Sequence, residues 1–126
     1  MNIPSDLRYT SHDEWIRLEG DTAVLGITDF AQDALGEIVY VELPEVGDSV
    51  EAGAAVCEVE SVKAVAEVYS PVAGTILEVN EDLDGGEQLV NEDPYGSGWL
   101  VKISMSSPGS ADGLLDADDY RAKISD

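Results

Sequence analysis

The chain has 126 residues, 44% hydrophobic and 26% charged, a balance typical of one folded domain rather than a disordered chain. A single cysteine, Cys57, excludes an intramolecular disulfide, and a single histidine, His12, argues against a zinc enzyme or a Ser-His-Asp triad. No apolar run approaches the ~18 residues of a membrane span, and the first residues lack a basic, apolar-cored signal. We therefore expect a cytoplasmic protein.

Charge is the most unusual feature of the composition. The chain has 27 acidic and 6 basic residues, a net charge of −21, and the acids are spread along its whole length. Nucleic acids and anionic membranes bind cationic surfaces, so neither is an expected partner. At ~1 M salt the Debye length falls to about 3 Å, which screens such self-repulsion. We hypothesise a halophilic cytoplasm and, because of the repulsion, a monomer.

The pattern along the chain predicts mostly strands. Residues 15–18 and 22–27 are β-rich runs around Gly20 and predict a hairpin. A short helix is expected over residues 28–36, with Thr28 or Asp29 as its N-cap and Gly36 at its end. Further strands are expected over residues 38–43, 55–60, 64–69, 75–79 and 99–103. Residues 106–109 form a turn-rich break, and residues 106–126 are predicted to be a helical appendage with a helix capped by Asp116.

A weak internal repeat has an offset of 33 residues. Residues 47–53 align with residues 80–86, which places Val56 on Leu89 and Glu60 on Asp93. Chance similarity in an acidic, glycine-containing chain is one explanation. The other is a sandwich of two equivalent sheet halves.

Lys63 stands alone in the middle of the chain. Residues 18–101 contain nineteen acids and one basic residue, Lys63, between two predicted strands. A lysine on a hairpin tip is poorly placed for Schiff-base catalysis, which needs a desolvated amine, but another enzyme could acylate it from outside. An ordinary surface lysine is the alternative. Cys57 is expected to be a buried apolar residue, and His12 a surface residue.

Several blocks of residues resemble the H protein family of the glycine cleavage system. Glu60, Ser61, Val62, Lys63 and Ala64 are similar to the lipoylation motif of that family, with Lys63 at the modified position. Residues 26–36, 43–47, 70–74 and 91–99 correspond to other family blocks, so the resemblance covers nearly the whole chain. It implies a mainly β, lipoyl-domain-like barrel-sandwich hybrid with short N-terminal and C-terminal helices. Residues 1–126 would be one lipoyl-carrier domain, in which residues 55–79 hold the strands flanking the lipoyl-lysine hairpin.

The resemblance also implies a cleft where a loaded lipoyl arm docks, with Glu14 near it. We hypothesise that an acid such as Glu14 or Glu67 pairs with the cationic amine of the loaded arm there. The family usually has His-Glu-Trp near its start, whereas this chain has Asp13, Glu14 and Trp15, with His12 one position early. Either His12 or Asp13 could take the place of the family histidine near the arm.

The implied function is that of a non-catalytic carrier with lipoate on Lys63. It would take the aminomethyl group of glycine from the pyridoxal-phosphate-dependent glycine decarboxylase (P protein) to the tetrahydrofolate-dependent aminomethyltransferase (T protein). Dihydrolipoyl dehydrogenase (L protein) would reoxidise it, and a lipoate ligase or lipoyl/octanoyl transferase would modify it.

Other functions remain open. The chain could be a lipoyl domain of a 2-oxoacid dehydrogenase, a protein that relays lipoate, or an unmodified acidic β-sandwich interaction domain. A 2-oxoacid dehydrogenase lipoyl domain would be shorter. A biotin carrier is disfavoured because Val62 and Ala64, not methionines, flank Lys63.

Overall fold

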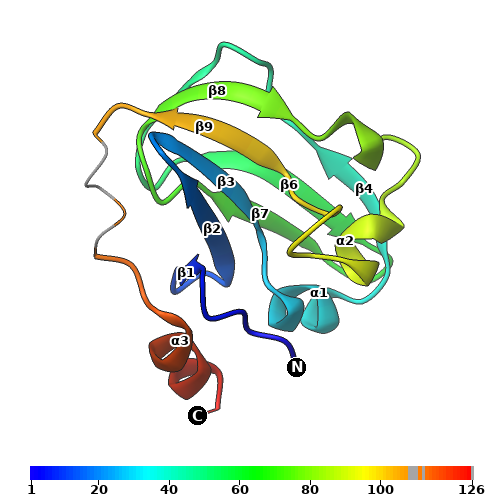
Figure 1. Cartoon of the computed structure of the whole chain (residues 1–126). Helices are drawn as coiled ribbons and strands as arrows, with labels where there is room; N and C mark the ends of the chain where they lie inside the picture. The colour runs from blue at the N-terminus through cyan, green and yellow to red at the C-terminus, as the bar shows by residue number, and fades with distance from the viewer. Residues whose placement is uncertain (108–110, 112, 126) are drawn as a thin grey trace.

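The computed structural model describes residues 1–107, 111 and 113–125. The chain forms two antiparallel sheets and a few short helices, as the sequence predicts (Figure 1). The elements in chain order are β1 Arg8–Tyr9, β2 Glu14–Glu19, β3 Thr22–Ile27, α1 Asp29–Leu35, β4 Ile38–Glu42, β5 Ser49–Val50, β6 Ala55–Ser61, β7 Val65–Tyr69, β8 Gly74–Val79, the 3₁₀ helix η1 Glu81–Leu83, α2 Gln88–Glu92, β9 Val101–Met105 and α3 Ala117–Ile124.

The sheets differ in size. One has six strands in the order β1-β2-β3-β9-β8-β5, and the other has three in the order β4-β6-β7. Their facing side chains form one core, to which Ile16 and Leu25 contribute from the larger sheet and Val59 and Val68 from the smaller. Burial of this apolar surface is the main force that holds the sheets together.

The larger sheet is also covered on its outer face, near its N-terminal strands. Trp15 and Val24 point away from the main core and join a second cluster with Tyr9 and with Ala117 and Tyr120 of α3. Successive side chains of β2 point to opposite faces of the sheet, and both sets are buried at its start because this part of the sheet is covered on each face. Figure 1 shows α3 beside β1, on the same edge of the molecule as the chain N-terminus.

Most predicted boundaries agree with the structure to within one residue. The strand expected over residues 99–103 instead begins at Val101, although Leu100 already donates its N–H to Leu25 at 2.8 Å. The helix capped by Asp116 is present as α3, with the side chain of Asp116 accepting from the Asp119 N–H. The break predicted over residues 106–109 lies partly outside the described residues. Strands β1 and β5 and helix α2 were not predicted.

The internal repeat does not produce equivalent halves. Val56 lies on strand β6, whereas its repeat partner Leu89 lies on helix α2. Asn80 starts η1 in the second unit by accepting the N–H of Asp82, so that segment turns where the first unit runs into a strand. The similarity between the two segments reflects turn chemistry and acidic composition, not a duplicated sheet.

Candidate functional site

Lys63 lies at the tip of the hairpin between β6 and β7, with its side chain exposed. The buried hydroxyl of Ser61 closes this tip: it accepts the N–H of Lys63 at 3.3 Å and that of Ala64 at 3.0 Å, and it donates to the carbonyl of Ala64 at 3.2 Å. Val62 donates its N–H to the carbonyl of Glu37 at 3.1 Å, which ties the tip to the segment before β4. The backbone under Lys63 is thus held in place while its amine faces solvent.

Helix α1 ends beside Lys63. Its N-cap is Thr28, whose hydroxyl accepts the N–H of Ala31, and it ends at Gly36, which has a φ of 84° that favours glycine. A Cβ on Gly36 would meet the Lys63 Cε at 3.4 Å, an ordinary van der Waals contact, so the positive φ rather than a lack of space favours glycine here, and the lysine side chain passes directly over the end of α1.

Asn91 of α2 fixes the end of α1. Its amide donates to the carbonyl of Gly36 at 2.8 Å and to Gln32 at 2.9 Å, while its carbonyl accepts the N–H of Ile38 at 2.9 Å. Sequence reasoning cited Asn91 only as part of a family block, and nothing in its spacing indicated this role. One side chain therefore sets the position of α1 relative to the start of β4.

A small cleft of about 200 Å³ lies between α1, the loop before β2 and the three-stranded sheet. Its apolar lining comes from α1 on one side and from β3, β6 and β7 on the other. Glu14 and Glu67 both line the cleft, as do His12 and Asp13. The first two are the residues predicted from the sequence to contact a docked arm. The full lining is His12, Asp13, Glu14, Ile27, Ala31, Ala34, Leu35, Val59, Ala66, Glu67 and Val68.

Glu14 is a buried acid at this cleft, with 2% of its surface exposed. One carboxylate oxygen accepts the hydroxyl of Thr10 at 2.8 Å, and the other accepts the backbone N–H of Tyr69 at 2.7 Å. Burial raises the pKa of Glu14, and these two hydrogen bonds partly offset that rise. The cleft thus contains a carboxyl group that is more readily protonated than an exposed glutamate.

The other polar residues at the cleft have different surroundings. Glu67 is exposed and accepts the hydroxyl of Tyr69 at 3.1 Å. The exposed ring of His12 lies 5.1 Å from the ring of Tyr69, whereas the Asp13 carboxylate accepts a hydrogen bond from Tyr120. Of these two residues at the border of the cleft, Asp13 has its side chain held by a hydrogen bond, whereas the His12 ring packs against an aromatic ring.

No other chemical centre is evident in the described part of the chain. Cys57 is buried, as predicted, and burial raises the pKa of its thiol to about 12, which keeps it protonated and unreactive. Among residues 1–107, 111 and 113–125, no three histidine, cysteine or acidic side chains are grouped as metal ligands. No helix in the same residues is long and apolar enough to cross a membrane.

Two packed antiparallel sheets and one lysine exposed on a closed hairpin define a class of small β-sandwich protein. Comparison with known proteins specifies the family. The family model for the glycine cleavage H-protein matches residues 7–126. The chain is 55% identical over 121 residues to the glycine cleavage system H protein of Thermus thermophilus, covering 96% of this chain and 94% of that protein.

The H protein of Bacteroides thetaiotaomicron is 49% identical over 124 residues, 98% of each chain. A crystal structure of a glycine cleavage system H protein from Mycobacterium marinum superposes with a TM-score of 0.90 at 38% identity, covering 98% of this chain and 99% of the other. The chain therefore belongs to the glycine cleavage H-protein family. The predicted fold class is confirmed.

Proposed function

We propose that the chain is a non-catalytic carrier that holds lipoate as an amide on Lys63. It would carry the aminomethyl group of glycine from glycine decarboxylase to the tetrahydrofolate-dependent aminomethyltransferase and then be reoxidised by dihydrolipoyl dehydrogenase. The observation that carries this proposal is the exposed amine of Lys63 on a tip whose backbone Ser61 holds in place. An acylating enzyme needs both access to that amine and a defined surface around it.

The residues near Lys63 fit a lipoyl arm. The lysine side chain lies beside Gly36 at the end of α1, and the cleft bordered by Ala31, Ala34 and Leu35 offers an apolar surface to an alkyl chain. When bound, lipoate supplies a ring disulfide at the end of a long tether. The cleft would shield the loaded end of that tether from water, and Glu14 and Glu67 place two carboxyl groups where a cationic amine could pair with them.

The partners would meet an apolar hairpin tip on an otherwise acidic protein. Glycine decarboxylase, the aminomethyltransferase, dihydrolipoyl dehydrogenase and the lipoylating enzyme must all reach Lys63 past the half-buried Glu60 and the exposed Val62 and Val65. Weak, transient contacts suit a carrier that visits several enzymes in turn. Cationic groups around the active-site entrances of these partners would complement the surface.

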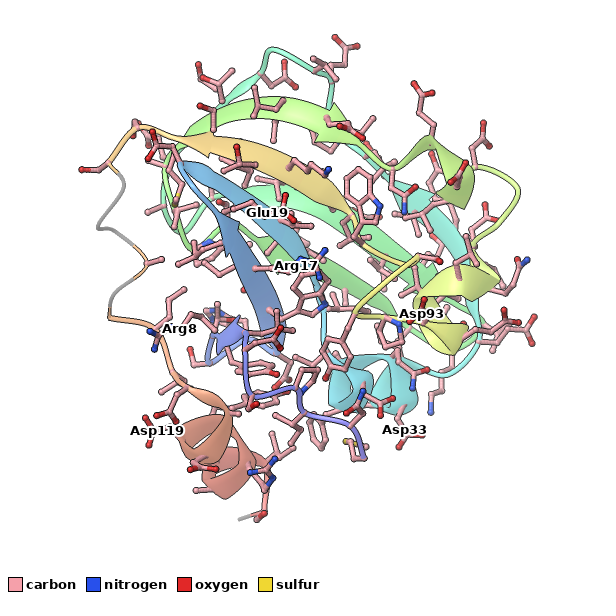
Figure 2. All side chains as sticks on the ribbon, viewed as in Figure 1. Arg8, Arg17, Glu19, Asp33, Asp93 and Asp119 are labelled. Atoms are coloured by element: carbon pink, nitrogen blue, oxygen red, sulfur yellow. The ribbon has the colours of Figure 1, made fainter. Side chains whose placement is uncertain are left out.

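We further propose that the acidic surface is an adaptation to a cytoplasm of molar salt. In Figure 2 carboxylate groups extend outward around the molecule, including Asp33 on α1 and Asp119 on α3. The described residues form three ion pairs, all between partly exposed side chains, such as Arg17 with Glu19. Such exposed pairs stabilise the fold little, and the net charge of −21 already counts their bases, so dissolved cations would have to screen the repulsion among the excess acids.

Modification of Lys63 can be tested directly. The protein is co-expressed with a lipoate ligase, and its intact mass is measured for the wild type, Lys63→Ala and Lys123→Ala, the last removing another exposed lysine. We expect the wild type and Lys123→Ala to gain one lipoyl group and Lys63→Ala to gain none. An unmodified wild type, or modification that persists in Lys63→Ala, would refute the assignment.

The carrier role needs a second assay. This assay follows the exchange of the carboxyl carbon of glycine with bicarbonate by glycine decarboxylase, with and without the carrier. We expect the lipoylated wild type to support this exchange and Lys63→Ala not to. A lipoylated wild type that supports no exchange, but serves a 2-oxoacid dehydrogenase, would contradict the proposal.

A further inference from the structure

A buried tyrosine of the C-terminal helix links two walls of the cleft. The hydroxyl of Tyr120 lies 2.9 Å from a carboxylate oxygen of Asp13 and 2.7 Å from the hydroxyl of Thr28. A carboxylate can only accept, and a phenol has one hydrogen to donate. Tyr120 therefore donates to Asp13 and accepts from Thr28, whose oxygen accepts the Ala31 N–H at 3.1 Å. Three hydrogen bonds run in one direction, from Ala31 to Asp13.

Both ends of this chain of hydrogen bonds lie at the cleft. Ala31 borders it from α1, and Asp13 borders it from the loop that precedes Glu14. A backbone bond from the Thr28 N–H to the Asp13 carbonyl, 3.0 Å long, runs parallel to the side-chain path. The hydroxyl of Tyr120 thus adds a side-chain bridge to this backbone bond between the loop and the first turn of α1.

The backbone of Asp13 also needs to be held. Its φ is 67°, the one positive φ outside glycine among the described residues. Aspartate tolerates this left-handed conformation better than most residues, but surrounding contacts must still maintain it. Its carboxylate bond to Tyr120 and its carbonyl bond to Thr28 are two such contacts. Glu14 follows directly in the chain, so the position of Glu14 depends on them.

We propose that Tyr120 is a positioning residue for the cleft: its hydroxyl holds α1 against the loop that carries Asp13 and Glu14. The structural part of this inference stands on the contacts above. Its functional consequence, that the cleft shields the loaded arm from water, rests on the proposed function. Packing of α3 does not require the hydroxyl, because the Tyr120 ring stacks on Tyr9 with centroids 4.8 Å apart and planes 9° apart. A phenylalanine at position 120 can keep that stack.

Tyr9 provides a matched control. It is as completely buried as Tyr120 and forms the other half of the stack, but its hydroxyl donates to the carbonyl of Pro4. Tyr120→Phe and Tyr9→Phe therefore remove the same atom from the two stacked rings. Only the first removes it from the path between the cleft walls.

The first measurement uses the unmodified protein and does not depend on the carrier role. Amide hydrogen exchange at Thr28 and Ala31 is followed by NMR in both variants. We expect Tyr120→Phe to accelerate exchange by roughly three- to tenfold, the range of one hydrogen bond, and Tyr9→Phe to leave it unchanged. Asp13→Gly, which suits the positive φ but removes the carboxylate, should give the same acceleration, and the double variant with Tyr120→Phe should add little.

The second measurement uses the lipoylated protein loaded by glycine decarboxylase with glycine radiolabelled at its methylene carbon, because the carboxyl carbon leaves as carbon dioxide. We expect the label to be lost to water several-fold faster from Tyr120→Phe than from Tyr9→Phe, while both are lipoylated at the wild-type rate. Equal behaviour of the two variants in either measurement overturns the inference. If the wild type cannot be loaded at all, the proposed function fails, and the exchange rates alone decide whether Tyr120 positions the cleft.

Discussion

The carboxylate of Glu14 accepts the backbone N–H of Tyr69 at 2.7 Å, and this bond joins the two sheets of the sandwich. Glu14 begins β2 in the six-stranded sheet, and Tyr69 ends β7 in the three-stranded sheet. A buried acid at the cleft is therefore also a connection between the layers. Its protonation should affect both the stability of the fold and the chemistry of the cleft.

The pH dependence of stability should reveal this acid. Since burial raises the pKa of Glu14 in the folded protein, the folded state holds the proton more tightly than the unfolded state, whose glutamate pKa is about 4.3. The stabilising contribution is complete below that value and is lost as pH rises through the folded-state pKa. The wild type should thus lose free energy of unfolding relative to Glu14→Gln over this window.

Denaturant unfolding at a series of pH values, in high salt to screen the other acids, measures the difference. Glu51→Gln, which removes an exposed acid from the turn after β5, controls for the loss of one charge. If the wild type instead gained free energy of unfolding relative to Glu14→Gln as pH rises, the folded state would favour the carboxylate.

Removing the Ser61 hydroxyl should loosen the lysine tip. Ser61→Ala leaves the N–H groups of Lys63 and Ala64 without their acceptor, and we expect a loss of about 1 kcal/mol in stability. Lipoylation of Lys63 should slow several-fold because the ligase meets a less ordered hairpin. Intact mass followed over time measures this rate, with the exposed Ser49→Ala as control. An unchanged rate would mean that the tip does not have to be preformed.

A row of three acids should weaken the smaller sheet at low salt. Glu42 pairs with Glu58 across β4 and β6, and Glu58 pairs with Glu67 across β6 and β7. Like charges directly opposite each other in a sheet are destabilising, by roughly 0.2–1 kcal/mol per pair. We expect Glu58→Gln to raise stability in dilute buffer and the gain to vanish near ~1 M salt, where the Debye length is about 3 Å.

Unfolding of the wild type and Glu58→Gln across a salt series checks this expectation, and Glu51→Gln again controls for total charge. The wild type itself should become more stable as salt is added. Equal stability of the wild type in dilute and molar salt would contradict the proposed halophilic adaptation.

Gly26 should be intolerant of a side chain. A Cβ at this position would lie 2.6 Å from the ring of Trp15, whose indole N–H donates to the carbonyl of Pro94 at 3.0 Å. We expect Gly26→Ala to cost about 1–3 kcal/mol, since the buried ring must shift. Gly113→Ala is the control because a Cβ there meets nothing within 4 Å. Thermal unfolding compares the two, and equal melting temperatures would show that the ring adapts freely.

Local chemistry explains what the sequence could predict. Strand runs, the Thr28 cap and the glycine at position 36 are local signals, and the structure confirms each of them. Lys63 also stood out locally, because a single cation among many acids is visible without any fold, and its place on a hairpin tip followed from the flanking strands.

Contacts between distant segments were not predictable in this way. Tyr120 meets Thr28 across 92 residues, and Asn91 meets Gly36 across 55. The two-residue strands β1 and β5 are too short to show a period and exist only because a longer neighbour pairs with them. The 33-residue repeat wrongly predicted two equivalent sheet halves, because the same turn residues occur whether the chain that follows them forms a strand or a helix.

The fixed length of α1 limits how this region can change in evolution or design. Thr28 and Gly36 determine its two ends, and Ala31 and Leu35 face the cleft between them. One inserted residue would turn every later position by about 100° around the helix axis and advance it by about 1.5 Å. Leu35 would then leave the cleft and the end of the helix would move away from Lys63. Insertions and deletions should therefore not be tolerated within these seven helical residues.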